Sequence, residues 1–408
     1  MGLGKTLQAL ALAANFRGDW PAIAIVPSSL KDQWNIQIRK WCSNLFEDID
    51  EQLQIINSGS DVVKKNIKFL LCSYEMASKV DAKTVNFQLA ILDESHYLND
   101  LKSKRSRTIL PFIKKMKRII CLTGTPALNA PVELYVHFLM LYPTKISLNE
   151  FADRYSIRKY NKFSRRIEYS DIRLEKELYF LLSYTFMIRR KKLNVLQELP
   201  DKIREPIFID ILEEESLPIQ TKLKQLQGNI LSNVESKLLI NELFKLTGSA
   251  KVKILKSYIE NIMHKAHKCV IFAHHIEVLK KIKEIIENLR YNYIYIDGSI
   301  AISSRKKYID QFVKGDASVA ILSVLACGTG LEFSVADSVV FAELYWVPGV
   351  LLQAEDRVHR IGSNHKTIKV YYMIAKNTID IIVWKKLNKK WKSLSSGLNG
   401  LTETFVNS

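Results

Sequence analysis

The stretch LAILDESH at residues 89–96 joins an apolar run to two adjacent carboxylates, and it predicts how this chain folds. Short continuous apolar runs are typical of strands that are buried on both faces of a parallel sheet. Open α/β sheets bind ligands beyond the carboxyl ends of their strands, which is where Asp93 and Glu94 would lie. One such acid can hold Mg²⁺ through its waters while its neighbour polarises an attacking water, as phosphoryl transfer requires. The alternative is that both acids are simply solvated at a strand end.

Similar apolar runs recur in both halves of the chain. They occupy residues 22–26, 67–72, 89–92 and 119–122, and then 270–273, 293–296, 318–322 and 338–341. Helical patterns lie between them, for example at 30–41 and 106–116. The segments 151–190 and 213–245 break this alternation and favour helices and irregular structure. The sequence therefore predicts an α/β fold with two parallel-sheet lobes separated by helical insertions.

The same pattern sets the expected domain boundaries. We expect a first lobe at 1–145, helical insertions or linkers at 146–249, a second lobe at 250–380, and a basic C-terminal helix and tail at 381–408. The basic helix combines several lysines with Trp384 and Trp391. It could serve nuclear import, DNA contact or packing against the lobes.

Composition narrows the class of protein and of partner. A length of 408 residues suggests roughly two or three domains, and 47% hydrophobic with 25% charged residues is typical of a globular chain. No apolar run approaches the roughly 20 residues that cross a bilayer. Lys and Arg number 60 against 42 Asp and Glu, so the formal net charge of +18 predicts a polyanionic partner, nucleic acid rather than lipid. The cysteines are widely spaced without a C-x-x-C pair, which favours a reducing compartment over a disulfide framework or zinc ribbon: Cys42, Cys72, Cys121, Cys269 and Cys327.

The first residues place Gly4-Lys5-Thr6 in front of a helical run. A phosphate-binding loop ends in this way, with backbone N–H groups and the helix dipole facing the phosphates. Two targeting patterns overlap it, because residues 1–14 loosely resemble a secretory signal peptide and residues 1–6 fit a myristoylation pattern. The paired carboxylates at 93–94 favour the phosphate-binding interpretation.

A second strand end supplies hydroxyl groups. Residues 122–126 have the sequence LTGTP, in which Thr123 and Thr125 flank a glycine. These groups could line the same cleft as the paired carboxylates. The alternative is an ordinary strand-to-turn exit.

Charged residues near the far end suggest a second half of the site. In QAEDRVHRIG at 353–362, Gln353, Arg357 and Arg360 fall at i, i+4 and i+7 and would share one helical face. Two arginines there could grip a phosphate as charge develops in the transition state. The alternative is an exposed helix in which Asp356 pairs with Arg360. The Gly328 to Gly330 turn would add backbone amides at the edge of the cleft.

Taken in order, these stretches resemble a known motif series. The series is MGLGKT (1–6), IVPSSLKDQW (25–34), LDESH (92–96), LTGTP (122–126), FMIRRKK (186–192), VIFAHH (270–275), YIDGS (295–299), AILSVLACGTGLEFSVADSVVFAEL (320–344) and QAEDRVHRIG (353–362). It resembles the Swi/Snf-like ATPases of helicase superfamily two, from Met1 to about Trp391. The sequence VFAELYWVPGVLLQAEDRVHRIG at 340–362, together with VIFAHH, DESHYLND and VLQELPDKIRE, is most similar to the annealing-helicase subgroup of HARP-type, fork-remodelling enzymes.

The resemblance implies two RecA-like lobes that close on ATP and Mg²⁺, with duplex DNA running across both. Lys5 would contact the β- and γ-phosphates, Thr6 and Asp93 would hold Mg²⁺, and Glu94 would activate water. Arg357 and Arg360 would be arginine fingers. Further nucleotide contacts would come from Gly2, Gly4, Gln353 and Gly330.

The resemblance also implies DNA contacts and coupling groups. Those near the DNA backbone would be Ser28, Ser29, Lys31, Gly298, Ser299, Gly328 and Thr329. Thr123 and Thr125 would couple nucleotide state to DNA grip. Phosphate contacts carry little sequence information, so binding should be selective for structure and sensitive to salt.

The chain departs from the family pattern at three places. Only three residues precede Gly4, which is too few for a full phosphate loop, and the strand that feeds the loop is missing from the first lobe. We expect an N-terminally truncated form of a longer protein or an ATPase that lost its nucleotide site. Ser363 replaces a glutamine, and Glu332 puts a negative charge near a DNA contact. A metal site at His264, His267 and Cys269 is disfavoured because no second ligand cluster accompanies it.

The leading hypothesis is an ATP-dependent double-stranded DNA translocase that remodels or re-anneals forked DNA in DNA repair and replication-fork maintenance. A chromatin-remodelling ATPase is the alternative with the same motor. A hypothesis of another class is a non-hydrolysing DNA-binding scaffold with a degenerate phosphate loop. We expect a monomeric motor in the nucleus, with no membrane partner, that contacts single-strand-binding protein or a sliding clamp through regions outside this sequence.

Overall fold

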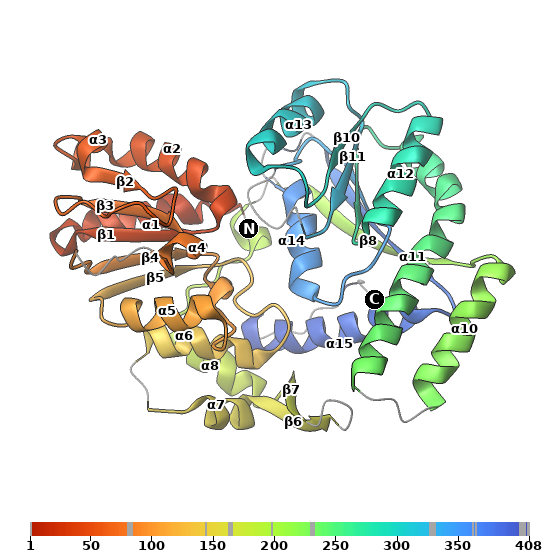
Figure 1. The fold of residues 1–408 in the computed structure, drawn as a ribbon, viewed down its shortest axis with the longest axis horizontal. Coiled ribbons are helices and arrows are strands. Elements are labelled where there is room, and N and C mark those ends of the chain that lie inside the picture. Colours follow the sequence, from red (N-terminus) through yellow and green to blue (C-terminus); the bar gives the residue numbers. More distant parts are fainter. Residues whose placement is uncertain are drawn as a thin grey trace. The chain divides into compact units, whose positions relative to one another are not determined.

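The computed structural model describes residues 2–79, 85–142, 145–161, 166–196, 199–228, 233–325, 332–360, 363, 365–399 and 405. They form two compact units (Figure 1). The first lobe comprises Gly2–Ser156 and Phe180–Ile188, and the second comprises Ile157–Tyr179 and Arg189–Ser408. Each lobe is described by itself.

The first lobe is built on a parallel sheet with the strand order β2-β3-β1-β4-β5. Its strands are β1 (Ala22–Val26), β2 (Leu53–Ile55), β3 (Phe69–Ser73), β4 (Leu89–Asp93) and β5 (Arg118–Leu122). Strands β1, β3 and β4 are buried along their whole length, as expected where helices cover both faces. In the register, Ala22 lies beside Phe69 on one side and Leu89 on the other, so the carboxyl ends of these strands lie at one edge.

Helices cover both faces of this sheet because successive strand residues point to opposite sides. One core packs the sheet against α1 and α2, and the other packs it against α5 and α6. The helices are α1 (Lys5–Asn15), α2 (Lys31–Cys42), α3 (Ile49–Gln52), α4 (Tyr74–Ala77), α5 (Lys104–Ile113), α6 (Tyr135–Leu141) and α7 (Leu148–Tyr155). Helix α8 (Glu175–Thr185) contributes residues to both lobes.

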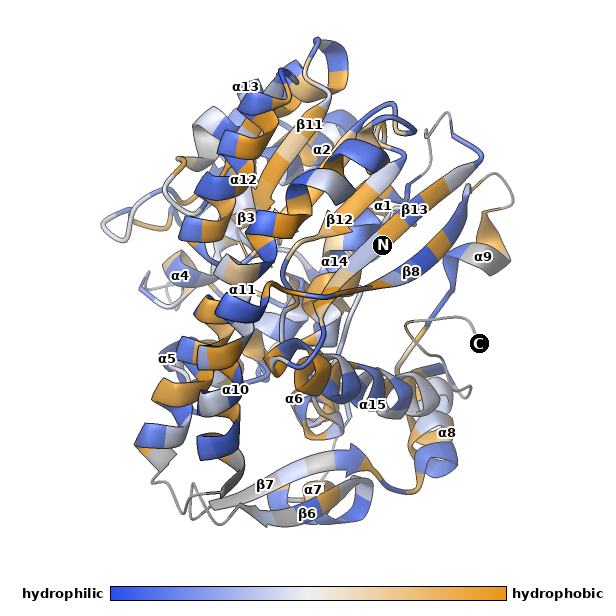
Figure 2. Cartoon of the chain, turned by 90° about the vertical axis from the view of Figure 1, so that its right-hand side faces the viewer, coloured by the Kyte–Doolittle hydropathy of each residue, from blue (hydrophilic) through white to orange (hydrophobic). Residues whose placement is uncertain are grey.

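The second lobe is built on a parallel sheet with the order β10-β11-β9-β12-β13-β8. Its strands are β8 (Asp201–Ile209), β9 (Cys269–Ala273), β10 (Tyr293–Ile296), β11 (Val319–Ser323), β12 (Ser338–Phe341) and β13 (Thr367–Ala375). The central strands are hydrophobic along their length, whereas β8 at the edge carries hydrophilic residues (Figure 2). The predicted α/β class with two parallel sheets is confirmed.

Two cores sandwich this sheet as well. One packs α11 and α12 on one face, and the other packs α13, α14 and α15 on the opposite face. The helices are α9 (Lys192–Val195), α10 (Glu213–Gly228), α11 (Asn233–Met263), α12 (Ile276–Asn288), α13 (Ile302–Lys314), α14 (Pro348–Val358) and α15 (Ile379–Asn399). The basic helix α15 packs on the core that it shares with α13 and α14, through Val383, Trp384 and Leu387. A buried ion pair between Lys251 and Asp380, with 2.8 Å between nitrogen and oxygen, ties α11 to α15.

The range 146–249 differs from the helical insertions expected there. It contains the two-stranded sheet of β6 (Ser156–Asn161) and β7 (Arg166–Ile172), and it also contains β8. Strand β8 pairs with β13 from Asp201 to Ile209 and so belongs to the second sheet. The sequence did not predict this strand, because Lys202 and Arg204 suggest exposure to solvent. In the structure both side chains form ion pairs with Glu355 of α14. No helix among the described residues has the length and apolarity to cross a membrane.

Candidate nucleotide site

The amino-terminal end of α1 has the backbone conformation and the free N–H groups that an anion-binding helix start requires. Gly2 and Gly4 have positive φ angles of 76° and 71°, which glycine adopts without strain. No side chain caps α1, its first turn holds no acidic residue, and a Cβ on Gly4 would meet no atom within 4 Å. The N–H groups of the first turn, which includes Lys5 and Thr6, are therefore left for an external acceptor.

The paired carboxylates lie at the carboxyl end of β4, as predicted, and both are buried. Asp93 Oδ2 accepts a hydrogen bond of 2.8 Å from Trp34 Nε1 on α2, and Asp93 Oδ1 accepts one of 3.0 Å from the Glu94 backbone N–H. The hydroxyl of Tyr74 donates to the Asp93 carbonyl oxygen at 2.8 Å. The first two bonds orient the carboxylate, and the Tyr74 bond holds the backbone at the end of β4.

Burial and the neighbouring charge of Glu94 raise the pKa of Asp93 to about 6, while Trp34 and Lys5 lower it. Helix α1, which begins at Lys5, shares one core with β4, which ends at Asp93. The structure therefore brings together the amine, the first helical turn and the paired acids. Two adjacent buried carboxylates also fit a divalent cation, which would neutralise their mutual repulsion.

Glu94 has a left-handed backbone with φ 49°, which is uncommon for a residue with a side chain. The Glu94 carboxylate lies 3.2 Å from His96 Nδ1, and the same nitrogen lies 3.1 Å from Thr123 Oγ1 after β5. The Thr123 hydroxyl in turn accepts the Thr125 backbone N–H at 3.1 Å. A chain of contacts therefore links the candidate water-activating acid to the LTGTP segment.

A second histidine supports the turn after β4. His137 Nε2 lies 2.8 Å from the Ser95 hydroxyl, and both residues are buried. Burial, with a smaller contribution from His96, lowers the pKa of His137 to about 4, so this imidazole is neutral at physiological pH. It positions the turn without adding charge to it.

The first-lobe residues expected near DNA lie at the end of β1. Ser28 and Ser29 are in the 3₁₀ turn Ser28–Leu30, and α2 begins at Lys31. The Lys31 ammonium donates to the Ile56 carbonyl at 3.0 Å and also to the Asn57 side chain. Lys31 therefore braces the loop after β2, which its sequence position alone did not indicate.

The second lobe carries the arginine motif on and after α14. Gln353 and Arg357 are buried in this helix. Arg360 lies beyond its end at Val358, so the three residues do not share one continuous helical face. Arg360 Nε donates to the Asp356 carbonyl at 3.0 Å, and Arg360 Nη1 lies 3.9 Å from Glu332.

The acids of this motif have partners that the sequence did not reveal. Glu355 is fully buried and receives two bonds from Arg204, of 2.8 and 2.7 Å, and one of 2.8 Å from Lys202. Burial opposes its ionisation, but Arg204 and Lys202 outweigh burial and lower the pKa of Glu355 to about 2. The Asp356 carboxylate pairs with Lys192 at 3.2 Å, whereas Arg360 Nε donates to the Asp356 backbone carbonyl. The alternative of a solvent-exposed helix is wrong, because Gln353, Glu355 and Arg357 are buried.

Other predicted contacts in the second lobe are only partly described. A Cβ on Gly298 would meet no atom within 4 Å, and Ser299 donates its hydroxyl and backbone N–H to Asp297. Gly328, Thr329 and Gly330 lie outside the described residues. Glu332 is exposed and faces Arg360.

The sequence did not predict the residues that position the candidate site residues through hydrogen bonds and contacts. Trp34 and Tyr74 fix Asp93, and His96 links Glu94 to Thr123. In the second lobe, the Glu343 carboxylate accepts hydrogen bonds from the backbone N–H groups of His274 and His275, and it lies 2.7 Å from His275 Nδ1. Trp34, His96 and Glu343 each lie inside a quoted motif, which was the only available signal.

Comparisons with known proteins identify the family. Residues 1–271 match the SNF2-related domain family, and residues 250–362 match the helicase conserved C-terminal domain. The human protein named DNA annealing helicase and endonuclease ZRANB3 is 37% identical over 422 residues, which cover 99% of this chain and 38% of that protein.

The Xenopus laevis protein named SWI/SNF-related matrix-associated actin-dependent regulator of chromatin subfamily A-like protein 1 is 35% identical over 410 residues, which cover 99% of this chain and 42% of that protein. This chain thus spans about two fifths of the length of these curated relatives. A solved structure, the Sulfolobus solfataricus SWI2/SNF2 ATPase core in complex with dsDNA, is 21% identical with a TM-score of 0.42, covering 99% of this chain and 91% of that one. The resemblance predicted from the motif series is confirmed by the family match, and the chain belongs to the SNF2-related family.

Proposed function

We propose that this chain is an ATP-dependent motor on double-stranded DNA that remodels or re-anneals forked DNA. The observation that carries the proposal is the first-lobe site, where an uncapped helix start, Lys5 and the buried Asp93–Glu94 pair lie together. Family membership supports the same activity.

In this proposal, the first turn of α1 and Lys5 bind the phosphates of ATP. Gly2 and Gly4 let the backbone approach them, since both have open positive-φ conformations. Thr6 and Asp93 would hold Mg²⁺, which neutralises phosphate charge when bound. Trp34 keeps the Asp93 carboxylate oriented for that role.

Glu94 accepts the proton of the attacking water. It is buried, and one of its carboxylate oxygens lies 3.2 Å from His96 Nδ1. Thr123 contacts the same imidazole, so a change in the charge around Glu94 reaches the LTGTP segment. We propose that Thr123 and Thr125 couple nucleotide state to DNA grip through this chain.

The second lobe contributes positive charge to hydrolysis. We propose that Arg357 and Arg360 act on the transferring phosphate, with Gln353 and Gly330 as nucleotide contacts. Glu355 and Asp356 hold this motif to β8 through Lys202 and Arg204 rather than neutralising the arginines.

The protein contacts the DNA backbone through its own main-chain and hydroxyl groups at the ends of strands. Ser28 and Ser29 follow β1, and Gly298 and Ser299 follow β10, while Gly328 and Thr329 belong to the same proposed set. Lys31 supports the first group by bracing residues 56–57. The net charge of +18 favours association with a polyanion, with affinity falling steeply as salt rises.

The names of the relatives support forked DNA as the substrate, because three of them are called DNA annealing helicases. The names also support a role in the nucleus. We propose that the chain acts as a monomer and that single-strand-binding protein or a sliding clamp is contacted by regions of the protein outside this sequence.

The test is strand re-annealing on a fork with a fluorophore and a quencher on its two arms. We expect ATP-dependent re-annealing by the wild type and none by Glu94→Gln, with DNA affinity unchanged. ATP hydrolysis should be stimulated more by the fork than by single strands. Equal stimulation by single-stranded RNA would contradict the proposal, and greater stimulation by nucleosomes than by naked forks would favour a chromatin remodeller instead.

A further inference from the structure

Three potential metal ligands lie at the amino-terminal ends of adjacent strands in the second lobe. His267 precedes β9, Asp337 precedes β12, and His365 precedes β13. The sheet order places β12 between β9 and β13, and Ser338 is in register with both Cys269 and Lys369. Residues that are distant in sequence are therefore brought to one spot by the parallel register.

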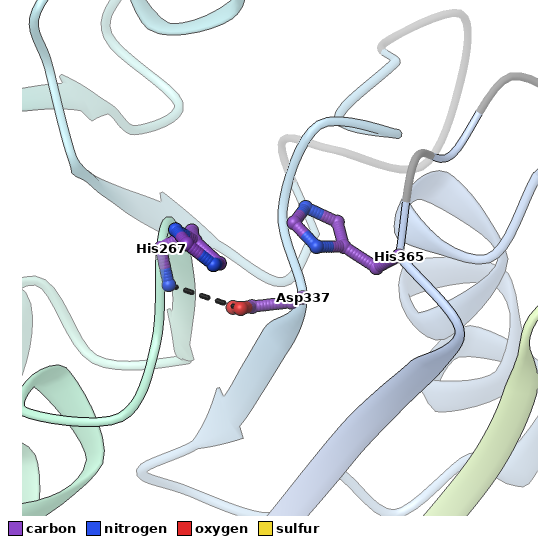
Figure 3. A group of neighbouring side chains, drawn as sticks. All are labelled: His267, Asp337 and His365. Atoms are coloured by element: carbon purple, nitrogen blue, oxygen red, sulfur yellow. Dashed lines mark hydrogen bonds between the residues drawn. The ribbon is translucent and has the colours of Figure 1, made fainter.

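The side chains at this spot face one another (Figure 3). One ligand atom from each residue lies within 4.8 Å of the other two. The two imidazole rings are nearly parallel, with centroids 5.5 Å apart and an interplanar angle of 27°. Asp337 Oδ2 accepts the His267 backbone N–H at 2.9 Å, which holds the carboxylate in place.

The remaining carboxylate oxygen has no hydrogen-bond partner in the part of the chain that the structure describes, although it is inaccessible to solvent. A buried carboxylate oxygen without a donor is costly, so it is a natural place for a cation. The Asp337 carboxylate shares this spot with the two imidazoles.

The hydrogen bonding of His365 prepares its ring to bind a metal. His365 Nε2 lies 3.0 Å from the Val335 carbonyl oxygen, which can only accept a hydrogen bond. The proton of a neutral His365 is therefore on Nε2, and Nδ1 keeps its lone pair. Metal-binding histidines commonly donate their second ring N–H to a carbonyl or carboxylate in this way.

We propose that His267, Asp337 and His365 bind a divalent transition metal ion, with Zn²⁺ as the physiological cation. Two imidazoles and a carboxylate are a common donor set for Zn²⁺, with water as a fourth ligand. Tetrahedral ligands at about 2.0–2.1 Å from zinc lie about 3.4 Å apart, so atoms that now lie within 4.8 Å of one another must approach by up to about 1.4 Å. His267 is exposed and can supply that movement by side-chain rotation.

This site is separate from the candidate nucleotide residues of the same lobe. Gln353 and Arg357 are on α14, and Ser299 follows the carboxyl end of β10, whereas the proposed metal lies at the amino ends of the strands. A bound ion there would join three strand starts and stabilise the second lobe without taking part in hydrolysis. His264, which the sequence placed beside His267, is exposed and does not belong to the cluster.

The test measures Zn²⁺ binding to the full chain after treatment with a chelator. Equilibrium dialysis with metal analysis should give one bound Zn²⁺ per chain at this site. His267→Ala and His365→Ala should each weaken it by about tenfold or more. His264→Ala is the matched control, because it removes an exposed histidine three residues away, and it should leave the affinity unchanged.

A thermal melt gives a readout that is independent of ATP hydrolysis. Zn²⁺ should raise the melting temperature of the wild type and of His264→Ala, and it should raise that of His267→Ala much less. Bound Co²⁺ should show visible absorption that His365→Ala removes. Absence of Zn²⁺ binding, or binding that is equal in His267→Ala, His365→Ala and the wild type, would overturn the proposal.

Discussion

The indole Nε1 of Trp34 donates a hydrogen bond of 2.8 Å to the carboxylate of Asp93, and both side chains are buried. The bond joins the helix after β1 to the end of β4. It therefore connects two motifs that are 59 residues apart in the sequence. The orientation of a candidate Mg²⁺ ligand thus depends on a tryptophan that has no catalytic chemistry of its own.

Trp34→Phe tests this dependence, because phenylalanine removes the donor and keeps one aromatic ring in the core. We expect the free energy of unfolding to fall by about 1–3 kcal/mol, which is typical when a hydrogen bond to a buried charged group is lost. The pKa of Asp93 should rise further, since the indole lowers it. Urea denaturation measures the first effect, and the acid limb of the pH profile of ATP hydrolysis measures the second.

Trp41→Phe is the matched control on the same helix. Trp41 is about half exposed and bonds only to Gln37 of its own helix at 2.8 Å. Its substitution should change the free energy of unfolding by less than about 0.5 kcal/mol. Identical results for the two variants would show that the Trp34–Asp93 bond has no role.

Asp93 also gives the first lobe a characteristic dependence on pH. Its pKa is about 6 in the folded chain, because of burial and Glu94, and about 3.9 when unfolded. Between these values the folded chain binds more protons than the unfolded one, so the free energy of unfolding falls as pH rises, by roughly 3 kcal/mol. Asp93→Asn removes this term.

The stability of Asp93→Asn relative to the wild type should therefore increase from about pH 4 to about pH 7. Denaturation of both proteins at the two pH values measures the change. The variant should at the same time lose ATP hydrolysis. A stability difference that stays constant with pH would contradict the assignment of a raised pKa to Asp93.

In the second lobe, Arg204→Ala should be strongly destabilising. Arg204 makes two hydrogen bonds to the fully buried Glu355, and its loss leaves a buried charge that Lys202 alone must match. We expect a loss of about 3–5 kcal/mol in the free energy of unfolding, measured by denaturation in urea.

The exposed ion pair between Lys376 and Asp210 provides a control of the same chemical type. Lys376→Ala should cost less than about 1 kcal/mol, because water solvates both partners. Replacing Arg204 and Glu355 together by methionine should cost less than Arg204→Ala, since the fully buried carboxylate is removed and Lys202 keeps Asp356 as a partner. Equal costs for Arg204→Ala and Lys376→Ala would contradict the role of the buried pair.

The sequence predicted the parallel sheets because the runs at 22–26, 89–92 and 270–273 are apolar throughout, and burial on both faces requires that composition. It did not predict β8. Lys202 and Arg204 make that strand look exposed, and only the fold reveals that Glu355 neutralises them.

The residues of the candidate site also fall into two groups, those that the sequence predicted and those that only the fold reveals. Residues with their own chemistry, such as Lys5, Asp93 and Glu94, were recognisable because their types and spacing are restricted by phosphate and Mg²⁺. Trp34 and His96 act through contacts that exist only after strands from distant segments pair. The end of α14 at Val358 was also not predictable, because Arg360 continues the helical spacing although it lies outside the helix.

The most direct test of the account is ATP hydrolysis by this 408-residue chain with and without forked duplex DNA. Lys5→Ala and Glu94→Gln serve as controls, since the first removes the phosphate-binding amine and the second removes the base. We predict hydrolysis that the fork stimulates and that either substitution abolishes. Fork binding without any ATP turnover by the wild type, or turnover that survives Lys5→Ala, would contradict the central claim that α1 and β4 form a working ATP site.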